Sequence, residues 1–209
     1  MFRSLTWIVA AVAFVLTAGA GSAAAQDAQY VGLKKCKTCH KKELIGDQIG
    51  SWQKMQHSKA FETLKGEKAL EVAKKLGLAG APSESADCLK CHVTAYEADD
   101  AKFAKGRRLD PANGVQCESC HGPGSLYKKK KVMADHAKSV AAGMWEPDKD
   151  EKICTACHND QSPTWDAAAG FDFEARKKEI AHKIPEDVKG KYLEVEKRLK
   201  AEKAAAGGK

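Results

Sequence analysis

The sequence predicts a mostly α-helical protein, a single domain of short helices and loops with very little strand. Two observations support this prediction. Several segments, of which residues 67–76 are the clearest, place apolar side chains at the spacing of one helix face. A five-residue pattern, Cys-x-x-Cys-His, also occurs four times at unequal intervals and uses every cysteine of the chain. Because residues three and four apart share a helix face, each copy of the pattern fits on one helical turn.

The Cys-x-x-Cys-His pattern is typical of covalent haem attachment. Its two thiols bond to a c-type haem, and the adjacent imidazole binds the iron. A zinc site also uses Cys-x-x-Cys pairs, but it does not need a histidine after every second cysteine. A thioredoxin-like dithiol would not recur four times. We therefore predict four covalent haems, held by Cys36 and Cys39, Cys88 and Cys91, Cys117 and Cys120, and Cys154 and Cys157, with His40, His92, His121 and His158 as proximal iron ligands.

The mature chain predicted below, residues 26–209, is short for four macrocycles. It cannot wrap them and also build a separate apolar core. No cysteine remains for a disulfide, the usual stabiliser of small exported domains. We therefore expect a single tetrahaem cytochrome c domain in which the haems form the core and short helices pack on them.

The first 25 residues are predicted to be a signal peptide. Arg3 supplies the n-region charge, residues 5–16 form an apolar segment, and residues 23–25 offer a small-residue cleavage site. The alternative is an uncleaved membrane anchor, but Thr, Gly, Ser and Ala dominate the second half of the segment, which makes it poor membrane material. We expect export to the periplasm and no stable membrane insertion after cleavage.

The formal net charge of +7 does not predict a nucleic-acid-binding protein. Each ferric haem with two ionised propionates carries net negative charge, so the loaded protein is closer to neutral. The remaining basic character is local: residues 128–131 are a lysine run, and five lysines flank the first motif. Such runs are ordinarily solvated faces, and the functional alternative is electrostatic steering of an acidic redox partner.

The rest of the chain is predicted to form helices separated by loops. We expect a helix that begins at Ser51 and carries His57, a second over residues 67–76, and an irregular segment over 94–113 with room for a short hairpin. Further helices are predicted over 128–142, carrying His136, and over 173–184, carrying His182. Residues 186–209 should form a helical, partly solvated tail.

Three histidines lie outside the motifs: His57, His136 and His182. A lone histidine is ordinarily a surface or satisfied core residue, but a chain that must cap several irons makes each a candidate distal ligand. Three imidazoles cannot cap four irons, so one haem should lack a distal histidine. A methionine could replace it, and the candidates are Met55, Met133 and Met144.

Three stretches closely resemble the tetrahaem cytochrome c-554 family: residues 36–40, residues 51–60, and residues 114–124, which read Gly-Val-Gln-Cys-Glu-Ser-Cys-His-Gly-Pro-Gly. Residues 171–182 also resemble the last ligand helix of that family. The resemblance implies a mostly helical periplasmic electron carrier that accepts electrons from a protein such as hydroxylamine oxidoreductase and passes them towards membrane cytochromes.

The resemblance also implies a ligand set. Carried over by motif, His136 would cap the haem of His40, His182 that of His121, and His57 that of His158. The haem of His92 would be five-coordinate. One departure is that the segment between His158 and the final ligand helix is shorter here, which affects the surroundings of the open haem.

Three functions compete at this point. The first is an electron carrier between redox proteins in nitrogen (hydroxylamine or nitrogen oxide) or anaerobic respiratory metabolism, without enzymatic activity. The second is a small reductase acting on nitric oxide or a similar nitrogen species at the five-coordinate haem, since metal catalysis needs an open position. The third is a subunit bound permanently to a larger reductase. We favour the carrier, because the sequence supplies no evident proton-delivery set.

Overall fold

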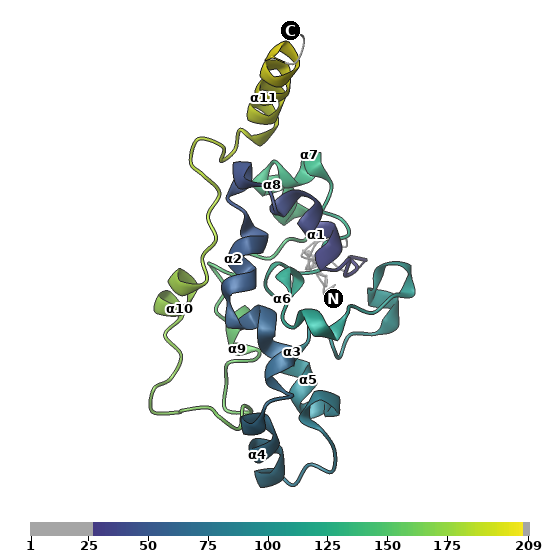
Figure 1. Cartoon of the computed structure of the whole chain (residues 1–209), viewed down its shortest axis with the longest axis vertical. Helices are drawn as coiled ribbons and strands as arrows, with labels where there is room; N and C mark the ends of the chain where they lie inside the picture. Colours follow the sequence, from purple (N-terminus) through teal and green to yellow (C-terminus); the bar gives the residue numbers. More distant parts are fainter. Residues whose placement is uncertain (1–26, 207–209) are drawn as a thin grey trace, which may run out of the picture.

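The computed structural model describes residues 27–206. Within them the chain forms eleven α-helices, which Figure 1 shows as short rods along an elongated body, with α4 at one end and α11 projecting from the other. The helices are α1 (Leu33–His40), α2 (Gln48–Lys54), α3 (Ala60–Thr63), α4 (Glu67–Lys75), α5 (Ala86–His92), α6 (Cys117–His121), α7 (Lys130–Met133), α8 (His136–Ala141), α9 (Lys152–Thr155), α10 (Phe173–Glu179) and α11 (Tyr192–Ala206).

Short 3-10 turns connect several of the helices. They are η2 (Glu43–Ile45), η3 (Gln56–Lys59), η4 (Pro82–Glu84), η5 (Asp100–Lys102), η6 (Ala104–Gly106) and η7 (Pro111–Asn113). In the described part of the chain, the β-type pairing is one isolated parallel bridge between Tyr30 and Phe103. The predicted mostly helical fold with very little strand is therefore confirmed, whereas segment 94–113 forms 3-10 turns in place of the hairpin that it had room for.

The cysteine motifs occupy helices, as their spacing predicts. The first three motifs each complete a helix, so that α1, α5 and α6 end at the motif histidine. The fourth begins within α9 at Cys154 and continues past its end, where the amides of Cys157 and His158 both bond to the carbonyl of Cys154. The thiols and the imidazole of each copy thus share one turn of chain.

The apolar core of the described residues is small. One cluster joins Ile45, Val188 and Val195 near the first motif. A second joins Leu64 on the end of α3 to Leu89 and Val93 around α5. Such small clusters agree with the expectation that prosthetic groups fill much of the interior.

Helix boundaries differ from the predicted ones where a local cap decides them. The helix predicted to begin at Ser51 starts at Gln48, because the carboxylate of Asp47 accepts a hydrogen bond from the amide of Gly50. The helix predicted over 128–142 is two helices, since the carboxylate of Asp135 caps α8 at the amide of Lys138. The helix predicted over 67–76 is present as α4.

The C-terminal third is less helical than predicted. The helix expected over 173–184 ends at Glu179, so His182 lies in the extended chain that follows α10. The tail helix begins at Tyr192 rather than near residue 186, and its start is docked, because Val188 and Val195 pack on Ile45.

The predicted signal peptide and the expected lack of membrane insertion after its cleavage both stay untested. The predicted signal peptide, residues 1–25, lies outside the described residues. Among the helices of residues 27–206, none has the length and apolar character needed to cross a membrane.

Candidate haem sites

The rings of His57 and His158 face each other edge to face. Their centroids are 5.9 Å apart and their planes are 89° apart. His57 comes from η3, and His158 ends the fourth Cys-x-x-Cys-His motif. Phe171 stacks on the other side of His158 at 5.2 Å and holds that ring in place.

A second pair repeats this arrangement. The rings of His121, at the end of α6, and His182, after α10, lie 5.9 Å apart with planes 84° apart. Edge-to-face rings at this distance can also be simple aromatic contacts. Here each pair joins one motif histidine to one histidine from outside the motifs. Imidazole nitrogens bind metal ions at about 2 Å, so the gap in each pair suits one ion held between two rings.

Burial favours the neutral form of His57, His121 and His158, which is the form that binds a metal. It lowers the pKa of His121 to about 4, and the neighbouring His182 lowers that pKa further. It also lowers the pKa of His57, where His158 adds to the effect, and the pKa of His158 itself, where Arg176 adds to it. The motif histidine of each pair is therefore held in the form that binds a metal.

Contacts at Nδ1 orient several rings and leave Nε2 free to bind a metal. Nδ1 of His92 lies 2.6 Å from the carbonyl oxygen of Ala60, and Nδ1 of His182 lies 3.1 Å from that of Ile180. Nδ1 of His121 is the one buried side-chain polar atom without a hydrogen-bond partner in residues 27–206. His121 therefore lacks the Nδ1 contact that orients the other two rings.

The structure does not assemble a third pair. Nε2 of His136 lies 2.9 Å from the carboxylate of Glu146, with two thirds of the His136 side chain exposed. His40 instead places its Nδ1 3.3 Å from the amide oxygen of Gln48. Within the described residues, His136 and His40 therefore make no ring contact.

The cysteines are free to form thioether bonds with a haem. All eight are half-buried and none is joined to another in a disulfide. Burial raises the pKa of Cys120 to about 11 and that of Cys157 to about 12. Reactive thiols need a lowered pKa, so Cys120 and Cys157 are not activated thiols.

Glu118, inside the third motif, is a structural residue that the sequence analysis missed. It is 1% exposed. Its two carboxylate oxygens accept hydrogen bonds from the backbone amides of Val31 and Gly32 at 2.7–3.1 Å, and from that of Gly124 at 2.7 Å. The residue therefore ties the chain before α1 to the chain after α6. A charged residue between two motif cysteines gave no signal of this role, because its partners are distant backbone amides.

A backbone crossing fixes the turn that carries His57. The amide of Val115 donates to the carbonyl of His57 at 2.9 Å, and the indole of Trp52 donates to the carbonyl of Val115 at 2.8 Å. Gly114 has a φ of 58°, and a Cβ there would lie 2.7 Å from the same His57 carbonyl. A glycine is therefore needed for the close approach that positions this ring.

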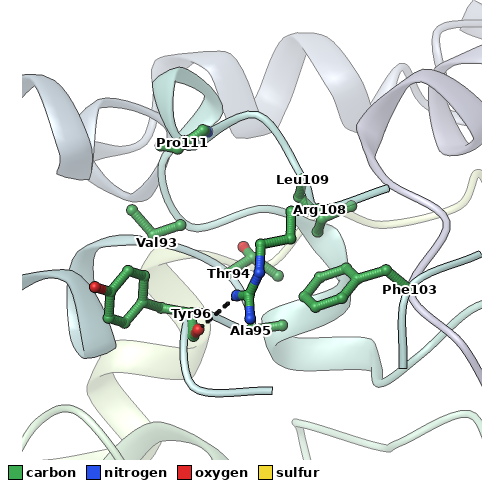
Figure 2. Close-up of a pocket in the computed structure, with 8 residues that line it drawn as sticks. All are labelled: Val93, Thr94, Ala95, Tyr96, Phe103, Arg108, Leu109 and Pro111. Carbon is green, nitrogen blue, oxygen red and sulfur yellow. Dashed lines mark hydrogen bonds between the residues drawn. The ribbon is translucent and has the colours of Figure 1, made fainter. Parts of the chain in front are cut away.

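A pocket of about 490 Å³ follows the second motif, and Figure 2 shows Arg108 across it. The guanidinium of Arg108 donates to the carbonyls of Tyr96 and Ala98 at 2.9 and 3.0 Å, and to Asp100 at 2.7 Å. It also lies 5.2 Å from the centre of the Phe103 ring. These contacts fix the loop around the pocket, which is lined by Val93, Thr94, Ala95, Tyr96, Phe103, Arg108, Leu109 and Pro111.

Comparison with known proteins gives one consistent result. The family model for cytochrome c554 and c-prime matches residues 35–122, which contain the first three motifs. Cytochrome c-554 of Nitrosomonas europaea is 35% identical over 178 residues, an alignment that covers 77% of this chain and 70% of that protein.

The fold agrees with the sequence. The solved structure of reduced cytochrome c554 from Nitrosomonas europaea superimposes with a TM-score of 0.54 at 29% identity, over 76% of this chain and 86% of that one. The chain therefore belongs to the cytochrome c-554 family of electron-transfer proteins, whose c-type haem is covalently bound.

Proposed function

We propose that this protein is a periplasmic tetrahaem cytochrome that carries electrons between redox proteins and has no enzymatic activity of its own. The observation that carries this proposal is the pair of opposed histidine couples, His57 with His158 and His121 with His182. An iron with two imidazole ligands has no free position for a substrate, which suits electron transfer.

Each motif would hold one haem through its two cysteines and its histidine, and the bound haem would supply one-electron chemistry. His57, His182 and His136 would be the distal ligands of the fourth, third and first haems. His92 would bind the iron that lacks a distal histidine, with its ring oriented by the carbonyl of Ala60. The chain's work is to orient these imidazoles and to keep water from them.

The periplasmic setting rests on the predicted signal peptide and on the export that c-type haem attachment requires. The partners would be redox donors and acceptors, such as hydroxylamine oxidoreductase or a membrane cytochrome, within nitrogen or anaerobic respiratory metabolism. The relationship to cytochrome c-554 supports this placement.

Stopped-flow mixing of the purified holoprotein with a reduced electron donor tests the proposal. We expect fast, multi-step reduction of the haems that reverses on addition of an oxidant. Steady-state assays with nitric oxide and hydroxylamine should show no useful turnover. Rates typical of enzymes, about 1 to 1,000 per second, would overturn the carrier assignment in favour of a reductase acting at the haem of His92.

A further inference from the structure

The lysines around the first motif differ from the charges around the other motifs. Residues 34–42 contain five lysines and no acidic residue, and all five are exposed. The fourth motif is instead flanked by Asp148, Asp150, Glu151 and Asp160, with two lysines among them. The chain is therefore electrically polarised between its first and fourth motifs.

A second basic run joins the first in space. Glu196 of α11 forms one ion pair with Lys42, at 3.4 Å, and another with Lys130 of α7. One carboxylate thus brings together two basic segments that are far apart in sequence. Figure 1 shows α1, α7 and α8 gathered in one part of the body, with α4 at the opposite end.

Most of these lysines remain uncompensated. Lys42 and Lys130 share Glu196, whereas their neighbours form no ion pair within residues 27–206. We call this set the first-motif lysine surface: Lys34, Lys35, Lys37, Lys41, Lys129 and Lys131. Three of its members lie on α1, the helix that also carries Cys36, Cys39 and His40.

We propose that the first-motif lysine surface is the docking site for an acidic redox protein, which exchanges electrons with the haem of the first motif. The proposal rests on the electron-carrier function above and adds the place of exchange and the charge of the partner. Uncompensated charges of one sign raise association rates with an oppositely charged partner by about 10- to 1,000-fold at low ionic strength. In the exchange one electron leaves the partner's cofactor and one ferric iron of this protein becomes ferrous.

Two triple variants of equal charge change test the location. The first is Lys34→Glu, Lys37→Glu, Lys41→Glu, and the control is Lys68→Glu, Lys74→Glu, Lys75→Glu in α4, where all three lysines are also exposed. The probe is an acidic flavodoxin, used as the hydroquinone donor in stopped flow and in its oxidised form for calorimetric measurement of Kd. Reduced lumiflavin, a small donor without a protein surface to dock, reports whether the haems are intact.

We expect the Lys34, Lys37, Lys41 triple to lower the association rate with flavodoxin by about tenfold and to weaken Kd in parallel. The α4 triple should change the rate by less than about twofold, and the difference should vanish near 1 M salt, where the Debye length is about 3 Å. Reduction by lumiflavin should be equal in all three proteins. Equal losses in the two triples would overturn the docking proposal, because net charge alone would then explain them.

Failure of the proposed function gives a different result. In that case neither flavodoxin nor lumiflavin would reduce the wild-type haems reversibly. If the glutamate triple does not take up haem, the milder triple Lys34→Gln, Lys37→Gln, Lys41→Gln replaces it, with a correspondingly smaller expected loss of rate. An unchanged rate in that variant would overturn the docking proposal.

Discussion

His57 faces His158 edge to face at 5.9 Å, and the same distance separates His121 from His182. Each couple joins a motif histidine to a distant segment of the chain. The couples therefore act as cross-links once a metal lies between the rings, and their loss should be visible in the spin state of the iron.

Replacing either His57 or His182 should leave one haem iron without its distal ligand. In His57→Ala and in His182→Ala, one low-spin haem should become high-spin, because the iron loses a strong ligand. Electron paramagnetic resonance and visible absorption measure this change. Added imidazole should restore the low-spin signal in both variants, and Lys183→Ala, beside His182, should leave the wild-type spectrum unchanged. A low-spin spectrum in His182→Ala without imidazole would contradict the assignment.

His136 needs a separate test, because its Nε2 is held by Glu146 in the structure. If it is the distal ligand of the first haem, His136→Ala should add one high-spin centre. Glu146→Gln, which weakens the competing contact, should preserve the low-spin spectrum. An unchanged spectrum in His136→Ala would instead assign this histidine to a surface ion pair.

One variant of the second motif tests both the number of covalent haems and the position of the iron that lacks a distal ligand. The intact mass of the exported protein should correspond to four covalent haems. In Cys88→Ser, Cys91→Ser it should fall by the mass of one haem, because both thioethers of the second motif are lost. The response to cyanide, which we expect from one haem of the wild type, should disappear in the same variant. A cyanide response that survives would place the open iron at another motif.

Glu118→Ala should lower the free energy of unfolding of the holoprotein by at least about 3 kcal/mol, because three backbone amides lose their acceptor and each unsatisfied buried donor costs about 1–3 kcal/mol. Glu118→Gln should also be destabilising, since its amide nitrogen would face amides that donate to the native carboxylate. Denaturant unfolding followed by haem absorbance measures both. The exposed Glu43→Gln is the matched control and should change stability by less than about 0.5 kcal/mol.

The contact of α11 with the body should depend on pH. Ion pairing with Lys130 lowers the pKa of Glu196 to about 2, below the usual value of about 4.3 for an unpaired glutamate. The stabilisation is therefore present above about pH 4.3 and is lost as the pH falls towards 2. Glu196→Gln should remove it at neutral pH and speed amide hydrogen exchange over residues 188–206. Glu202→Gln, paired only with Arg198, should leave exchange near Val188 and Val195 as in wild type.

What the sequence predicts well is local. The motif spacing places thiols and imidazole on one turn, and the apolar stripe of residues 67–76 forms α4 nearly to the residue. The two ring couples agree with the resemblance but follow from no local pattern, because segments far apart in the chain meet there.

Two predicted helix boundaries are wrong because an aspartate side chain caps a helix at another residue. Asp135 divides the helix predicted over 128–142, and Asp47 moves the start of α2. His182 lies beyond the end of α10, since its position depends on His121 rather than on helical periodicity. Glu118 could not be found from its motif, because its hydrogen-bond partners are main-chain amides of remote residues.

The hydrogen bond from Gly32 to Glu118 spans 86 residues of chain. If the chain is exported N-terminus first, as we propose, the amides of Val31 and Gly32 would lack this acceptor until the third motif has emerged. Contacts of such long sequence separation form late in folding. Under that proposal Cys36 and Cys39 would remain in open chain while the next motif is delivered, which would leave them accessible for haem attachment before the fold closes.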